Sequence, residues 1–150
     1  VDKEMVKISG AIPVDNISEN LQKMDAVTLH CPKNDETTDL FTKKEFNLMK
    51  KSSFIINCAR GGILNEEDLY EALKNENISG AGLDVFDVEP TPSSNPLFKL
   101  NNVILSPHIA GVTVESTVRM ATETVQNVLD VLDDKVNQSV VINNKEIGMK

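Results

Sequence analysis

The sequence predicts an α/β fold built on a doubly wound, parallel, Rossmann-like sheet. Short apolar runs with β-branched residues alternate with segments whose apolar residues have helical spacing. In addition, the apolar run at residues 53–57 leads into Arg60, two glycines and a helix-start signal, which is the order of a strand, a turn and a helix. A length of 150 residues with 40% hydrophobic residues is enough for one domain with a buried core.

The first part of the chain predicts short elements. In order, we expect a helix over residues 1–9, an edge strand over 11–14, a short helix over 16–23, a buried strand over 25–31 and a polar loop over 33–40. Asp2 is a candidate N-cap and Gly10 a left-handed stop for the first helix. Pro13 restricts its strand to a sheet edge. Asn16 begins a capping-box-like start, and Pro32 ends the buried strand.

The second part predicts longer elements. In order, we expect a helix after residue 42, a strand at 53–57, a helix over 65–74, strands at 78–86 and 101–106, a long helix over 113–134 and an apolar stub at 140–142. Thr42 and Glu45 match a capping box. Asn65 is the cap of a helix whose acidic first turn complements the helix dipole. The long helix, capped by Thr113, has the strongest helical spacing.

Composition excludes several classes of partner. The net charge of −8 and the absence of a basic stripe argue against nucleic acid. No apolar run approaches the roughly 18 residues that span a bilayer, and the start lacks the pattern of a signal peptide, so we expect a cytoplasmic protein without a membrane partner. Cys31 and Cys58 stand at apolar strand ends outside any Cys-x-x-Cys pair, and we expect them to be buried, reduced thiols.

Four polar residues lie at or just after the ends of predicted strands: Arg60, Asp84, Glu89 and His108. Parallel strands place their carboxyl ends on one edge of the sheet, so these side chains should converge. Arginine can grip a carboxylate with two hydrogen bonds, and a histidine oriented by glutamate can exchange a proton with a hydroxyl or carbonyl oxygen. Such a site would hold a 2-oxo or 2-hydroxy acid. Taken singly, however, Arg60 can also be a solvated turn residue, and His108 a residue that ends a strand.

Two further patterns carry less weight. Gly80-Ala-Gly82 resembles the start of a dinucleotide fingerprint, but no third glycine follows and the segment continues as a strand. His30, Cys31, Cys58 and His108 lack the spacing of zinc ligands, so we expect no metal.

The motifs together resemble D-isomer-specific 2-hydroxyacid dehydrogenases over nearly the whole chain. The matching motifs, in the family's order, are Leu29-His-Cys-Pro32 with Thr37, Asn57-Cys-Ala-Arg-Gly-Gly62, Gly82-Leu-Asp-Val-Phe86 with Glu89-Pro90, and Ser106-Pro-His-Ile-Ala-Gly111 with Thr113. The chain looks most similar to the D-3-phosphoglycerate dehydrogenase branch, although the motif at residues 57–62 also fits hydroxypyruvate and glyoxylate reductases.

The resemblance implies an NAD-dependent oxidoreductase that moves a hydride between nicotinamide and C2 of a small D-2-hydroxy or 2-oxo acid. Arg60 would bind the substrate carboxylate, and His108, paired with Glu89, would be the acid/base. The implied cofactor contacts are Pro32, Thr37, Cys58, Ala59, Arg60, Asp84, His108, Ile109, Ala110 and Gly111. The resemblance also implies that the protein forms a homo-oligomer, specifically a dimer. The alternatives are an NAD-sensing interaction protein on the same fold and an inactive fragment.

The family's earlier strands and its Gly-x-Gly-x-x-Gly turn have no counterpart in this sequence. We therefore expect residues 1–134 to form an incomplete NAD-binding domain and residues 135–150 to be a segment that returns to a substrate domain in the family. With the usual strand order, residues 11–14 and 25–31 would lie on either side of a gap in the sheet. Such a chain alone should be poorly stable and bind NAD weakly.

Overall fold

A computed structural model of the chain describes residues 2–143. It divides into two compact units, Val1–Ala110 and Gly111–Lys150, each of which is described by itself. The predicted boundary at residue 134 stays a prediction, and residues 144–150 of the predicted C-terminal segment lie outside the described part.

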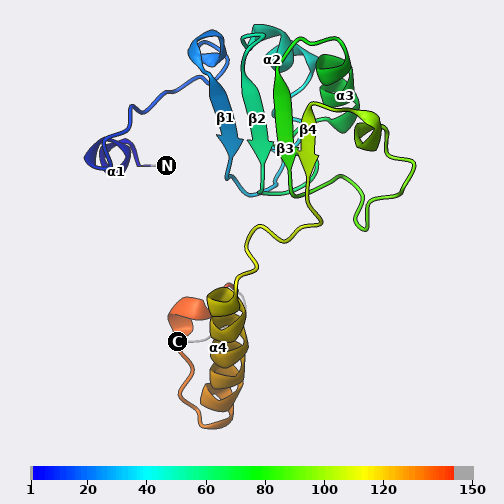
Figure 1. Cartoon of the computed structure of the whole chain (residues 1–150). Coiled ribbons are helices and arrows are strands. Elements are labelled where there is room, and N and C mark those ends of the chain that lie inside the picture. Colours follow the sequence, from blue (N-terminus) through cyan, green and yellow to red (C-terminus); the bar gives the residue numbers. More distant parts are fainter. Residues whose placement is uncertain (1, 144–150) are drawn as a thin grey trace. The chain divides into compact units, whose positions relative to one another are not determined.

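The first unit is built on a parallel sheet of four strands (Figure 1). The strands are β1 (Ala26–Leu29), β2 (Phe54–Asn57), β3 (Gly80–Leu83) and β4 (Val103–Leu105), and they lie side by side in chain order. Leu29 pairs with Asn57, and Asn57 with Leu83, so the strands end at nearly the same level. The sequence therefore brings the residues that follow each strand to one edge, as predicted for a Rossmann-like sheet.

Two helices cover one face of this sheet, α2 (Lys43–Leu48) and α3 (Glu66–Lys74) (Figure 1). Their predicted caps are present: the Glu45 carboxylate accepts hydrogen bonds from the Thr42 amide and hydroxyl at 3.1 and 2.8 Å, and Asn65 accepts one from the Asp68 amide at 3.1 Å. The core between sheet and helices consists of aliphatic and phenylalanine side chains that are fully buried, among them Phe41, Phe46, Ile55, Ile63, Leu64, Leu69, Leu73 and Ile78. Burial of these side chains is the main stabilising term.

The segment before β1 differs in part from its prediction. Helix α1 (Lys3–Ile8) forms with Asp2 as N-cap and Gly10 in the left-handed region, as expected. The predicted strand at residues 11–14 is wrong: Ile12 is 87% exposed, and the segment pairs with no strand of the sheet. A four-residue strand without a ladder partner has little to stabilise it.

Two further expectations for this region change with it. The predicted helix at residues 16–23 is reduced to turns and the 3₁₀ helix Leu21–Lys23. The gap expected between residues 11–14 and β1 does not occur in the described sheet, because β1 to β4 form one continuous ladder and the segment that would stand across the gap is not a strand.

The second unit contains α4 (Val114–Leu132) and the 3₁₀ helix Gln138–Val140. Thr113 caps α4, since its Oγ1 accepts a hydrogen bond from the Ser116 amide at 3.1 Å. The apolar stripe predicted from the sequence is present, but no residue of α4 is buried. Among residues 2–143, no helix combines the length and hydropathy that a bilayer crossing requires.

Candidate active site

The turn after β2 carries Arg60 and is shaped by Asn57, the last residue of that strand. The Asn57 side chain is buried; its Nδ2 donates to the Arg60 carbonyl at 2.9 Å, and its Oδ1 accepts from the Ala59 amide at 3.0 Å. These two bonds close the turn on itself, so the exposed Arg60 guanidinium leaves the sheet at a fixed point. One guanidinium N–H donates to the Ala59 carbonyl at 2.6 Å.

Gly61 lets the turn approach the segment that follows β3. A Cβ at this position would lie 1.9 Å from the Phe86 carbonyl oxygen and 2.8 Å from the Asp87 amide nitrogen, closer than atoms can pack. Only glycine fits there. The next residue, Gly62, has φ +77°, a conformation that glycine adopts without strain.

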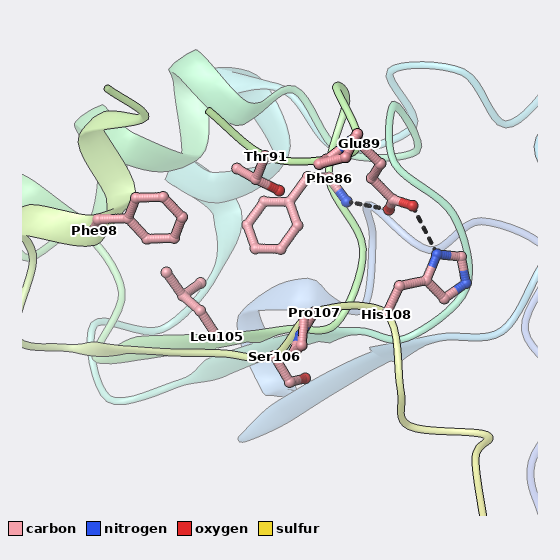
Figure 2. A pocket seen from close by; sticks show the side chains of 9 residues that line it. Phe86, Glu89, Thr91, Phe98, Leu105, Ser106, Pro107 and His108 are labelled. Carbon is pink, nitrogen blue, oxygen red and sulfur yellow. Dashed lines mark hydrogen bonds and ion pairs between the residues drawn. The ribbon is translucent and has the colours of Figure 1, made fainter. Parts of the chain in front are cut away.

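His108 and Glu89 form a direct pair (Figure 2). The His108 Nδ1 lies 2.7 Å from one Glu89 oxygen, and the other Glu89 oxygen accepts from the Phe86 amide at 2.9 Å. The hydrogen bond from His108 and then that from Phe86 lower the pKa of the Glu89 carboxyl. Because an ionised carboxylate only accepts, Nδ1 carries the proton of this bond, and Nε2 is left to give or take a proton.

Asp84 fixes the backbone on which His108 stands. Asp84 is 2% exposed, and its carboxylate accepts hydrogen bonds from Ser106 Oγ at 2.6 Å and from the amides of Ile109 and Ala110, both at 2.8 Å. Burial raises the pKa of Asp84, but these three donors outweigh it and the net pKa is lowered. Donors on either side of His108 thus hold that residue in a left-handed conformation with φ +55°.

Two cavities share the Glu89–His108 pair. The first, of about 790 Å³, lies at the carboxyl ends of the strands and is lined on one side by residues that follow β1 and β2. The second, of about 640 Å³, has the pair as part of its wall and is mostly apolar, with Phe86, Phe98 and Leu105 pointing into it (Figure 2).

The predicted cofactor residues divide between the cavity and its supports. Those that line the larger cavity are Pro32, Cys58, Ala59, Arg60 and His108. Thr37 does not line it; its hydroxyl donates to the Pro32 carbonyl at 2.6 Å and holds that loop. Asp84, Ile109 and Ala110 are joined to one another in the support of His108. Gly111 belongs to the second unit.

Several residues of this site were missed by the sequence reasoning. Lys33 and Asp87 also line the larger cavity, and nothing in the sequence marks their position there. Asn57 is the first residue of the motif at residues 57–62. Its position at a strand end, next to a turn, could have indicated a side chain that forms hydrogen bonds with the backbone. The expectation of two buried thiols is wrong: Cys58 is exposed and Cys31 is half-buried, because both lie past the strand ends beside the cavity.

The geometry defines a Rossmann-like α/β domain in which an arginine and a histidine–carboxylate pair meet beside one cavity at the sheet edge. The cavity fits part of a dinucleotide for two reasons. It lies outside the carboxyl ends of the strands, where such sheets bind ligands, and the turns that follow β1 and β2 line it. The family model described as "D-isomer specific 2-hydroxyacid dehydrogenase, NAD binding domain" matches residues 2–110, and the chain belongs to this family. The predicted family and the NAD cofactor are thereby confirmed.

Similar proteins include the D-3-phosphoglycerate dehydrogenase of Methanocaldococcus jannaschii, 40% identical over 141 residues, which are 94% of this chain and 27% of that protein. The glyoxylate reductase of Thermofilum pendens is 42% identical over 85% of this chain and 37% of its own length. The chain thus spans about a third of the curated relatives it matches.

Solved structures agree with the fold. The NAD-complexed D-isomer specific 2-hydroxyacid dehydrogenase of Lactobacillus delbrueckii ssp. bulgaricus superposes with a TM-score of 0.81 at 28% identity, covering 90% of this chain and 45% of that one. The holo form of D-mandelate dehydrogenase from Rhodotorula graminis gives 0.77 at 34% identity, covering 87% and 37%. The predicted Rossmann-like fold is confirmed by these matches.

Proposed function

We propose that this chain carries the acid/base and carboxylate-binding half of an NAD-dependent dehydrogenase acting on a small D-2-hydroxy or 2-oxo acid. The observation that carries the proposal is the Glu89–His108 pair at 2.7 Å, on the same cavity as Arg60. Bound NAD would exchange the hydride with C2 of the substrate. Within the family, D-3-phosphoglycerate is the substrate that we propose first, because a D-3-phosphoglycerate dehydrogenase aligns over 94% of the chain.

In this proposal each residue acts through the group that the structure leaves available. The planar Arg60 guanidinium has five donors, and the bond to the Ala59 carbonyl uses one of them, so a carboxylate can be held by two others. In the oxidising direction His108 Nε2 takes the proton of the substrate hydroxyl, and in reduction it returns that proton to the C2 oxygen. Glu89 stabilises the imidazolium that forms in oxidation.

The test is turnover by the full-length protein. NADH oxidation with glyoxylate or hydroxypyruvate, and NAD reduction with D-3-phosphoglycerate, should be measured for the wild type and for His108→Ala, Arg60→Ala and Arg60→Lys. We expect each variant to lose about 10²–10⁴-fold in kcat/KM, with Arg60→Lys also poor because the two-pronged grip is lost. Lys51→Ala, an exposed cation outside the site, is the matched control. Near-normal rates in all three site variants would refute the assignment.

The homodimer and the cytoplasmic location belong to the same proposal. Light scattering on the full-length protein tests the first and cell fractionation the second; a monomer, or a membrane-associated protein, would contradict them.

A further inference from the structure

We propose that Glu66 is a positioning residue that holds the Glu89–His108 pair in its working geometry. Glu66 touches neither member of the pair. It stands in the first turn of α3 and binds the segment that carries Glu89 at both of its ends. This inference rests on the proposed function only for its effect on catalysis, since its structural part is measured by titration and not by turnover.

The two oxygens of Glu66 hold two different donors. Oε1 accepts from the Asp87 amide at 2.5 Å, and Oε2 accepts from Asn95 Nδ2 at 3.0 Å. Residues 87–95 form an irregular loop between these two points, and Glu89 stands in that loop. Helix α3 is anchored in the core through the buried Leu69, so Glu66 ties the loop to a helix that the core holds in place.

The same contacts reach His108 in one further step. The amides of two successive residues are each held by a carboxylate: that of Phe86 by Glu89 at 2.9 Å, and that of Asp87 by Glu66. The second oxygen of Glu89 is the one that meets His108. The two N–H groups belong to successive peptide planes that meet at the Phe86 Cα, so a displacement of the backbone at Phe86 would disturb both bonds, and the bond to Glu66 resists that displacement.

A carboxylate is required at this position because both partners are donors. Asn95 cannot turn its amide to offer an oxygen, since its Oδ1 already accepts from the Leu97 amide at 3.0 Å. A glutamine at position 66 could serve the Asp87 amide but would face Asn95 Nδ2 with a second N–H group. The double variant, Glu66→Gln with Asn95→Asp, places the amide at position 66 and the carboxylate at position 95. The NH₂ group of the new glutamine can then donate to the new carboxylate, so each acceptor again has a donor.

The Glu66 carboxylate repels the nearby Asp87 carboxylate, and its position at a helix start does not explain why a charge is present there. The Asp87 carboxyl has a raised pKa, first because of burial and then because of the nearby Glu66 carboxylate. The neighbouring Glu67 is exposed, lies in the same first turn and serves the helix dipole without such repulsion. The two hydrogen bonds to the loop are what distinguish Glu66 from Glu67.

The test uses the isotope-labelled full-length protein in four forms: Glu66→Gln, Asn95→Asp, the double variant, and Glu67→Gln as the matched control. Carbon-detected NMR titration follows the Glu89 carboxyl. We expect the pKa of Glu89 to rise in each single variant at 66 or 95, to return to the wild-type value in the double variant, and to stay unchanged in the control. The amide spectrum of each form verifies folding; if Glu66→Gln fails to fold, the comparison of Asn95→Asp with the double variant makes the same test.

Turnover of the full-length protein gives the second readout. We expect kcat to fall on the order of tenfold in Glu66→Gln with little change in KM, and to recover in the double variant. An unchanged Glu89 titration in both single variants, or a double variant more disturbed than either, would overturn the positioning role. A rescued titration together with a full-length wild type that turns over no 2-oxo acid would instead refute the proposed function and leave the positioning role intact.

Discussion

Asp84→Asn tests how much the support of His108 depends on a buried carboxylate. In the wild type, one Asp84 oxygen accepts from Ser106 Oγ and the Ile109 amide, and the other accepts from the Ala110 amide. Asparagine keeps one oxygen and can retain the first two donors, but its NH₂ group then faces the Ala110 amide. An unsatisfied buried donor costs about 1–3 kcal/mol, and a bond to a charged group contributes about 1.5–3 kcal/mol. We expect a loss of about 2–3 kcal/mol.

The assay is urea unfolding followed by far-UV circular dichroism, with Asp35→Asn, an exposed aspartate, as the control. The pKa of Asp84 is lowered in the folded state. Its contribution to stability is therefore complete above the unfolded carboxyl value of about 3.9 and is lost as the pH falls through the lower folded value. The difference between wild type and Asp84→Asn should thus be full at pH 7 and shrink below about pH 4. A difference below about 0.5 kcal/mol at pH 7, or one that grows on acidification, would refute the reasoning.

Two further predictions concern stability alone. Gly61→Ala should cost about 3 kcal/mol, because the new methyl group would collide with the Phe86 carbonyl, whereas Gly111→Ala, with no atom within 4 Å of its Cβ, should change little in the same urea assay. Equal effects of the two changes would contradict the close approach. Glu45→Gln should cost about 1 kcal/mol at neutral pH, because it weakens the capping box with Thr42. Burial raises the pKa of Glu45, but the bonds from Thr42 lower it below its usual value, so this difference should also vanish as the pH falls below about 4. A constant difference across pH would contradict it.

Helix starts and buried strands were predictable because their signals are local. Thr42, Asn65 and Thr113 were identified as caps from the residues next to them, and each makes the hydrogen bond that the pattern predicts. Residues 11–14 were not predictable in the same way. Whether a short apolar run becomes a strand depends on a partner strand, and the run itself carries no information about one.

The site was predictable in outline and not in its supports. Arg60, Glu89 and His108 follow strand ends, so the parallel topology alone brought them together. The bonds from Asn95 to Glu66 and from the Ala110 amide to Asp84 join residues 29 and 26 positions apart. Such contacts depend on how loops fold over one another, which no local pattern records.

The position of a strand in the sheet also determines how easily local unfolding displaces the site residue that follows it. Arg60 follows β2, which is bonded on both sides, whereas His108 follows β4, a three-residue edge strand held by β3 alone in the described sheet. Detaching β4 breaks a single ladder, so local opening there needs less free energy than opening at β2. Mild heat or low denaturant should therefore release the acid/base histidine before the domain melts. Amide hydrogen exchange would then be faster at Ser106, whose amide donates to the Leu83 carbonyl, than at Asp84, whose amide donates to the Asn57 carbonyl of β2, and inactivation would precede the loss of secondary structure.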